Sequence, residues 1–182
     1  NGLAEIVKHA LIADAEMFAY IEKHAEKALA LDPEVIARLV GDSVRIKAAV
    51  VGRDEREAGE RRKLNFGHTL GHALEAAGRF SHGEAVSVGM VFAADVSVRR
   101  GRLDAAAFDR LLRLLNALRL PTAAQVDLRR VQEAVGKDKK RAGESIHFVQ
   151  LDGIGNSAVD KISLDEFKRW LSEAGGILRP AK

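Results

Sequence analysis

The sequence contains no cysteine and few prolines or aromatic residues. Its 182 residues include 3 Pro and 5% aromatic side chains. Without cysteine, disulfides and thiolate metal ligands are excluded, so any bound metal must be held by histidine and carboxylate groups. Alanine, leucine and charged residues dominate instead. Their intrinsic preference for helix over strand predicts a mostly α-helical chain.

Long apolar runs and a strong charge of one sign are also absent. No uncharged stretch of about 18 apolar residues could span a membrane, and the N-terminus lacks the pattern of a signal peptide. The net charge is only +3, with 30% charged residues of mixed sign, which does not indicate nucleic-acid binding. The 47% hydrophobic residues suffice for a packed core. We therefore expect a globular, cytoplasmic protein that binds neither nucleic acid nor membrane.

Apolar residues recur every three to four positions, which predicts a series of helices. The expected helices cover residues 3–12, 14–31, 35–51, 65–77, 82–100, 105–118 and 127–135, and a last one begins near Ser163. The helix over 82–100 carries few charges and should be central. The charged stretch 52–63 is interpreted as a solvated loop. Strand propensity at 145–151, followed by a turn, predicts a small β-hairpin near 145–160.

Three of the six histidines fall within fifteen residues. His68 and His72 are four residues apart, so a helix would present both imidazoles on one face, as in helix-borne zinc sites. His82 strengthens that interpretation. Gly67 and Gly71 disfavour helix by about 1 kcal/mol each relative to alanine and need a reason, such as close approach of a ligand or of another helix. The alternative is a helix with incidental histidines beside a packing groove.

A catalytic zinc ion would need a carboxylate in addition to histidines, and an open position for water or substrate. The candidate carboxylates are Glu57, Glu75 and Glu84 nearby and Glu5 far away in the sequence, and spacing does not choose among them. Basic residues would form an anion pocket only if they converge on the histidines. The candidates for that role are Lys8, Lys47, Arg61 and Lys139.

Long motifs surround the histidines. They are RDE-x-E-x-G-x-R at 53–61, LNFGHTLGHALE at 64–75 and HGEAV-x-x-GM at 82–90, flanked by GLAEIVK at 2–8 and KDKK at 137–140 with Gly143. In this order they resemble 3-dehydroquinate synthase, and they extend over most of the chain. The resemblance implies the helical C-terminal domain of the dehydroquinate synthase-like fold, with a metal site and a substrate site.

The resemblance divides the histidine cluster between two roles. It implies that Glu5, His68 and His82 bind a divalent metal, normally zinc. It assigns substrate contacts to Lys8, Lys47, Arg61, Asn65, His72 and Lys139, with Lys140 as the alternative to Lys139. Among the catalytic residues, Glu57 matches a carboxylate implicated in water-mediated proton transfer, and Lys8 and His72 act on the substrate.

The family's enzyme is a lyase of the shikimate pathway, in aromatic amino acid biosynthesis. It converts 3-deoxy-arabino-heptulosonate 7-phosphate, a sugar phosphate, to 3-dehydroquinate and phosphate with NAD. The resemblance implies an N-terminal NAD-binding domain that has no counterpart here, and a homodimer as the full-length enzyme. We therefore expect residues 1–182 to be a single C-terminal domain that is inactive alone.

Two alternatives stay open. The chain could belong to another sugar phosphate cyclase, although Arg61, beside His72 and Lys139, favours a substrate that carries a carboxylate. It could also be a non-catalytic helical interaction module that a metal stabilises.

Overall fold

Helices make up most of the molecule. The computed structural model describes residues 1–55, 59–78, 80–139 and 145–180, with residues 137–139 described by their backbone alone. The helices are α1 (Gly2–Ala13), α2 (Ala15–Leu29), α3 (Pro33–Arg53), the 3₁₀ helix η1 (Glu60–Asn65), α4 (His68–Ala76), α5 (His82–Arg99), α6 (Ala105–Ala117), α7 (Leu128–Lys139) and α8 (Leu164–Glu173). The prediction of a mostly helical chain is confirmed. In the described part of the chain, no helix has the length and apolar character needed to cross a lipid bilayer.

Two small sheets accompany the helices. Strands β2 (Ser145–Gly153) and β3 (Asn156–Ser163) pair antiparallel, with a register irregularity close to the turn. This is the hairpin expected near 145–160. The second sheet, which the sequence pattern does not predict, pairs the three-residue strands β1 (Ala124–Val126) and β4 (Leu178–Pro180) in parallel.

Side-chain caps explain where several helices begin. Asp14, Asp104 and Ser163 each accept a hydrogen bond from the backbone N–H three residues later, which satisfies a donor that the helix leaves free. Asp32 accepts from two such N–H groups and precedes Pro33 in the first turn of α3. At the other end of α5, Gly101 has φ +69°, a left-handed conformation that favours glycine after a helix.

The segment before α4 differs from the expectation. Residues 52–63, interpreted as a solvated loop, include the end of α3 and most of η1, and the helix expected over 65–77 begins only at His68. The Asp54 carboxylate accepts hydrogen bonds from the N–H groups of Gly59 (2.8 Å) and Arg61 (2.9 Å), so it holds the start of η1. The charged residues here therefore form structure through hydrogen bonds that periodicity does not reveal.

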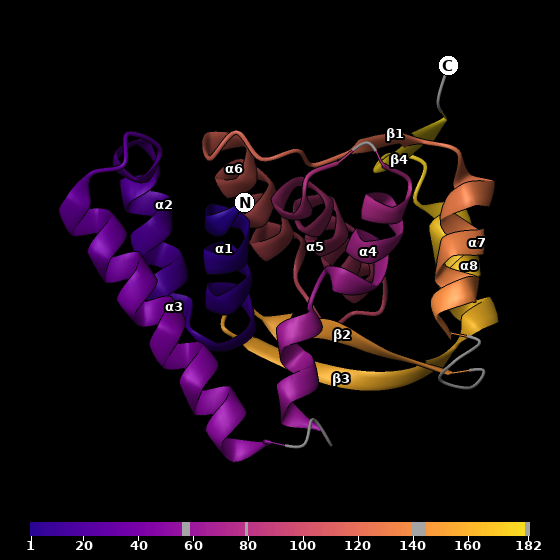
Figure 1. Cartoon of the computed structure of the whole chain (residues 1–182), viewed down its shortest axis with the longest axis horizontal. Helices are drawn as coiled ribbons and strands as arrows, with labels where there is room; N and C mark the ends of the chain where they lie inside the picture. The colour runs from indigo at the N-terminus through magenta and orange to yellow at the C-terminus, as the bar shows by residue number, and fades with distance from the viewer. Residues whose placement is uncertain (56–58, 79, 140–144, 181–182) are drawn as a thin grey trace.

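Helix α5 lies at the centre of the fold (Figure 1), and most of its residues between Gly83 and Ser97 are buried. Helices α1, α4 and α6 and strand β2 pack against it. At its hairpin side, the rings of Phe92, Phe148 and Phe167 meet edge to face at centroid distances of 5.6–6.2 Å. The expectation that the 82–100 helix is central is confirmed, and its first turn is fixed at the place where α1 and α4 meet.

Candidate functional site

Two glycines set the close approach of α4 to α5. Gly67 has φ +76°, and a Cβ atom there would lie 2.8 Å from the Met90 backbone nitrogen. A Cβ atom on Gly89 would lie 1.9 Å from the Gly67 carbonyl oxygen, so neither position accepts a side chain without movement of the backbone. The reason for Gly67 is thus contact between helices rather than contact with a ligand. As a result, His68, the first residue of α4, lies beside His82, the first residue of α5.

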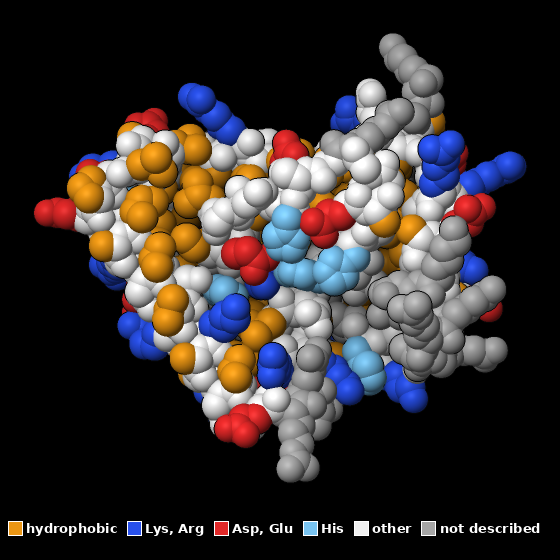
Figure 2. Space-filling view, viewed as in Figure 1, with side chains coloured by type: hydrophobic (Ala, Val, Ile, Leu, Met, Phe, Trp, Pro, Cys, Tyr) orange, Lys and Arg blue, Asp and Glu red, His pale blue; other side chains and the backbone are white. Residues whose placement is uncertain are grey.

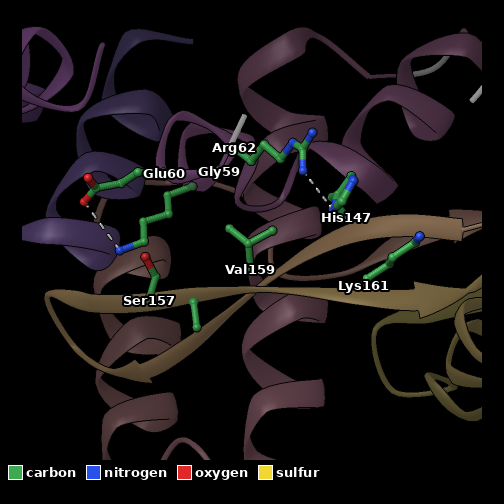
Figure 3. Close-up of a pocket in the computed structure, with 9 residues that line it drawn as sticks. Gly59, Glu60, Arg62, His147, Ser157, Val159 and Lys161 are labelled. Carbon is green, nitrogen blue, oxygen red and sulfur yellow. Dashed lines mark hydrogen bonds and ion pairs between the residues drawn. The ribbon is translucent and has the colours of Figure 1, made fainter. Parts of the chain in front are cut away.

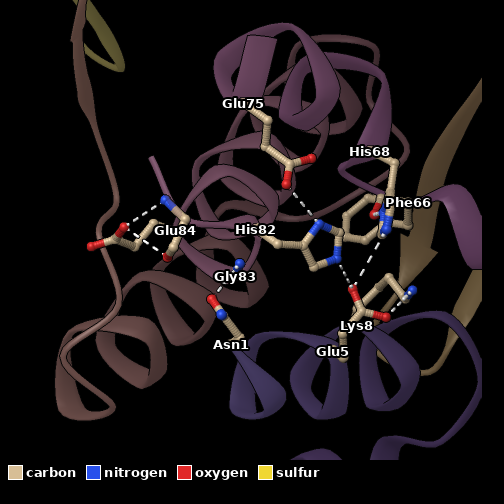
Figure 4. A network of polar contacts seen from close by, with 10 residues as sticks. Asn1, Glu5, Lys8, Phe66, His68, Glu75, His82, Gly83 and Glu84 are labelled. Atoms are coloured by element: carbon tan, nitrogen blue, oxygen red, sulfur yellow. Dashed lines mark hydrogen bonds and ion pairs between the residues drawn. The ribbon is translucent and has the colours of Figure 1, made fainter. Parts of the chain in front are cut away.

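Side chains from three helices converge at this point (Figure 4). Glu5 Oε1, from α1, lies 3.5 Å from His68 Nε2 and 3.4 Å from His82 Nε2. Each of the three residues offers one ligand atom within 4.8 Å of the others, which makes a group able to hold a metal ion. Figure 2 shows histidine and carboxylate side chains gathered at the centre of one face of the molecule. We call Glu5, His68 and His82 the metal cluster.

Hydrogen bonds on the far side of each ring determine which nitrogen faces the cluster. His68 Nδ1 lies 3.1 Å from the Phe66 carbonyl oxygen, and His82 Nδ1 lies 3.0 Å from Glu75 Oε1. A carbonyl and a carboxylate only accept hydrogen bonds, so both Nδ1 atoms carry the proton and donate. Both Nε2 atoms therefore face Glu5, and the neutral form of each ring directs a lone pair toward it. This is the arrangement that orients histidine ligands in metal sites.

The metal cluster thus brings three electron-pair donors together without a positive centre between them. Glu5 Oε1 is buried and accepts no hydrogen bond from the described residues. Burial, reinforced by the Lys8 charge, lowers the pKa of His68 to about 4, so His68 is neutral at pH 7 and provides no proton. Three facing lone pairs repel one another unless a cation lies among them. The residues fit a divalent metal held by two imidazoles and a carboxylate.

A buried lysine adjoins the metal cluster. Lys8 is 3% exposed, and its Nζ donates a 2.7 Å hydrogen bond to Glu5 Oε2. Burial lowers the pKa of Lys8, against the opposing effect of Glu5. Burial also acts to raise the pKa of Glu5, but the Lys8 ammonium and its hydrogen bond outweigh this and leave that pKa below its ordinary value. Lys47, exposed on α3, is close enough to lower the pKa of Lys8 further.

The carboxylates suggested by spacing have separate tasks. Glu75 does not join the cluster but accepts the hydrogen bond of His82 Nδ1. Glu84 accepts from the Ser81 N–H (2.9 Å) and hydroxyl (2.7 Å), which caps α5. The metal cluster uses the distant Glu5 instead. The pair of His68 and His72, four apart, is not a shared ligand pair either, since His72 is exposed and outside the metal cluster, with its ring centroid 5.4 Å from that of His68.

The remaining predicted catalytic and substrate residues are only partly described. Arg61 donates from its guanidinium to the Glu55 carbonyl at 3.0 Å, and Asn65 is exposed at the end of η1. Glu57 and Lys140 lie outside the described residues. Lys139 ends α7, but its side chain is not described. The roles of these residues stay predictions.

Sequence reasoning overlooked one buried polar pair next to this site. His9 Nδ1, on α1, lies 2.6 Å from the Ser43 hydroxyl on α3, and burial lowers the pKa of His9 to about 4. A histidine inside an otherwise apolar helix face was the signal that could have drawn attention to it. The pair joins the two helices that carry Lys8 and Lys47.

Comparison with known sequences gives a family for this arrangement. A family model described as 3-dehydroquinate synthase C-terminal matches residues 2–141. The 3-dehydroquinate synthase of Halorhodospira halophila is 44% identical over 162 residues, which are 87% of this chain and 46% of that protein. The chain therefore spans about half the length of the curated relative that it matches.

Solved structures share the fold. 2-epi-5-epi-valiolone synthase from Streptomyces hygroscopicus subsp. jinggangensis, solved with NAD⁺ and Zn²⁺ bound, gives a TM-score of 0.79 at 27% identity, over 94% of this chain and 50% of that chain. 2-deoxy-scyllo-inosose synthase, complexed with carbaglucose-6-phosphate, NAD⁺ and Co²⁺, gives a TM-score of 0.79 at 24% identity, over 94% and 51%. Since the family model covers most of the sequence and the fold agrees, this chain belongs to the 3-dehydroquinate synthase C-terminal family.

Proposed function

We propose that these residues form the metal- and substrate-binding half of a 3-dehydroquinate synthase. This lyase converts 3-deoxy-arabino-heptulosonate 7-phosphate to 3-dehydroquinate and phosphate. The observation that carries the proposal is the convergence of Glu5 Oε1, His68 Nε2 and His82 Nε2, three lone pairs that require a cation. The family match and the zinc in the valiolone synthase structure support the choice of a divalent metal, zinc.

The metal, when bound, polarises the substrate hydroxyl that is oxidised and stabilises the negative charge that develops on its oxygen. Lys8 contributes a cation beside the metal cluster, held at 2.7 Å from Glu5. Because burial lowers the pKa of Lys8, its Nζ proton is easier to transfer than that of an exposed lysine. His72, exposed next to the His68 ring, is free to contact the substrate from the open side.

Cationic side chains are proposed to orient the anionic groups of the substrate. Lys47, Arg61, Asn65 and Lys139 are proposed to hold the carboxylate, hydroxyls and phosphate, and Glu57 to take part in water-mediated proton transfer. Arginine and lysine suit these groups because charge-assisted hydrogen bonds are strong and directional. NAD, the hydride acceptor, is proposed to bind to a part of the full-length enzyme outside these 182 residues, so the chain alone would not complete the reaction.

Phosphate release tests the proposal. The chain is mixed with the heptulosonate phosphate, zinc and NAD, with and without the NAD-binding half of the relative from Halorhodospira halophila. We expect phosphate only when both halves are present, and none with His68→Ala. Release by the chain alone would contradict the two-part arrangement. Zinc binding without release in any combination would favour the non-catalytic interaction module.

Another sugar phosphate cyclase is the second candidate, because the 27% identical structure is a 2-epi-5-epi-valiolone synthase. A heptulose phosphate that lacks the carboxylate separates the two. With both halves present, we expect turnover of the carboxylate-bearing substrate only, and Arg61→Gln should raise its KM more than it lowers kcat, because Arg61 binds a group remote from the oxidised carbon. Preference for the substrate without a carboxylate would reverse this assignment.

A further inference from the structure

A pocket separate from the metal cluster lies between η1 and the β2–β3 hairpin (Figure 3). Its volume is about 600 Å³, and none of the metal cluster residues lines it. The lining side chains that matter here are Glu60, Arg62, Lys63, His147, Val159 and Lys161. We call this space the hairpin pocket.

Basic groups dominate the hairpin pocket. Arg62, Lys63 and Lys161 line it together with one carboxylate, that of Glu60. Arg53 donates hydrogen bonds to both Glu60 carboxylate oxygens, at 2.9 and 3.3 Å. Lys63 Nζ forms an ion pair with Glu60 Oε1 at 3.7 Å. Arg53 does not line the pocket. Arg53, from outside the lining, therefore neutralises much of the Glu60 charge. The remaining side chains leave the pocket positively charged.

Three nitrogen-bearing side chains from separate segments gather at one end. His147 and Lys161 are directly opposite each other on β2 and β3, so their side chains stand on the same face of the hairpin. Arg62 Nη1, on η1, lies 3.3 Å from His147 Nδ1. Since a guanidinium has only donors, the His147 nitrogen accepts this bond. The contact holds Arg62 against His147, whose register partner on the neighbouring strand is Lys161.

Neither Arg62 nor Lys161 forms an ion pair with a carboxylate among the described residues. Two cations that line one concave space and are paired with no acid repel each other, whereas an oxyanion bound by both gains charge-assisted hydrogen bonds. The pocket floor is apolar at Val159, and the Ser157 hydroxyl is occupied because it donates to the Ile12 carbonyl. Recognition in this pocket therefore depends on the basic side chains.

We propose that the hairpin pocket binds a small molecule through an oxyanion group, a phosphate or a carboxylate, held by Arg62 and Lys161. This binding needs neither the metal cluster nor NAD, so its outcome is independent of the proposed enzymatic function. Because η1 carries Arg62 as well as Arg61 and Asn65, an anion in the pocket also holds the element that presents two predicted substrate residues.

Titration of the metal-free, ¹⁵N-labelled chain with inorganic phosphate, and separately with citrate, tests the proposal by NMR. We expect saturable shifts at Arg62, His147 and Lys161, distinct from any shifts at Lys8 and His68. Stronger shifts with phosphate or with citrate tell which oxyanion the pocket prefers. Saturation with neither ion would overturn the proposal.

A double variant with a matched control separates a site from general attraction. Arg62→Gln with Lys161→Gln should weaken the binding at His147 at least about tenfold, because two charged donors are lost. Arg130→Gln with Lys23→Gln removes the same charge from exposed positions outside the pocket and should leave the affinity unchanged. Equal weakening in both variants would show attraction by net charge only and would refute the site. Circular dichroism establishes that each variant is folded.

Discussion

The metal cluster and the hairpin pocket have opposite electrostatic imbalances. The cluster collects three acceptors, Glu5 and two imidazoles, within 4.8 Å. The hairpin pocket collects donors, Arg62 and Lys161, without a paired acid among the described residues. The first suits a cation and the second suits an anion. When a concave site gathers side chains of one electrostatic character, they indicate a ligand of the opposite charge.

The two regions also differ in rigidity. Hydrogen bonds to Phe66 and Glu75 fix each imidazole of the cluster, and Glu5 is tied to Lys8. In the hairpin pocket long side chains end in an open space, and Lys161 is exposed. A pre-oriented site can bind tightly and selectively, whereas mobile side chains lose entropy on binding. We therefore expect strong effects from changes at the cluster and weak effects at the pocket.

The largest effect should follow loss of a ligand from the metal cluster. His68→Ala should lower zinc affinity by more than about a hundredfold, beyond what loss of an orienting partner causes. His72→Ala, one helical turn away, should leave the zinc content unchanged because His72 lies outside the cluster. Elemental analysis after dialysis measures both. Equal zinc loss in the two variants would mean that His68 and His72 bind the metal together.

Removing an orienting carboxylate should have the next largest effect. Glu75→Ala frees His82 Nδ1 and should weaken zinc binding about 10- to 100-fold. Glu84→Ala is the matched control, since Glu84 caps α5 and does not touch the cluster. That variant should lose about 1 kcal/mol of stability but keep its zinc affinity. Isothermal titration with zinc and thermal unfolding separate the two outcomes, and a zinc defect in Glu84→Ala would count against the assigned roles.

Acid should destabilise the metal-free chain through its buried histidines. His9 and His68 have pKa values of about 4 in the folded chain, against 6.5 when unperturbed. Above pH 6.5 both histidines are neutral in the folded chain and in the unfolded chain, so the difference in pKa does not affect stability. As the pH falls from 6.5 toward 4, the unfolded chain takes up the protons first, and stability falls by up to about 3 kcal/mol per histidine.

Urea unfolding across this pH window measures the slope. His9→Asn retains an acceptor for Ser43 but cannot titrate, so its slope should be smaller than that of the wild type. His24→Asn, on α2, is the matched control because His24 is only partly buried, and it should keep the wild-type slope. A slope that is the same in all three chains would attribute the pH dependence to other groups.

The smallest effect should come from the hairpin pocket. Lys161→Gln removes an exposed charge opposite His147 and close to Arg62, so the free energy of unfolding should change by no more than about 0.5 kcal/mol, in the stabilising direction. Lys23→Gln is the exposed control. A loss of more than about 1 kcal/mol in Lys161→Gln alone would mean that Lys161 has a structural partner, and it would weaken the contrast between the two regions.

The fold was largely predictable from local patterns. Periodicity and capping residues located the helices to within a few positions, because a buried stripe and a satisfied N-terminus are properties of neighbouring residues. Burial was less predictable. Val40 and Val44 belong to the apolar pattern of α3, yet they are 48% and 61% exposed. Periodicity shows which residues share a face, but the elements packed against that face decide its burial.

Part of the site was predictable as well. The motifs, read through the family resemblance, placed Glu5 with His68 and His82, and the structure brings these three together. The partners of these residues were not predictable. The S-x-x-E pattern of Ser81 and Glu84 indicates a helix cap, but no pattern in the sequence shows that Glu75 orients His82. The contact of Glu75 with His82 depends on the direction of each side chain after α4 and α5 have packed.

The sequence by itself determined the helical class, the hairpin and the residue types available for a metal, because composition and short-range periodicity govern these properties. The tertiary structure decided which lone pairs meet. It brought Glu5 of α1 to the starts of α4 and α5, turned both Nε2 atoms toward Glu5, and set Arg62 of η1 against His147 of the hairpin. Such convergence depends on distances between residues far apart in the chain, which spacing along the sequence does not contain.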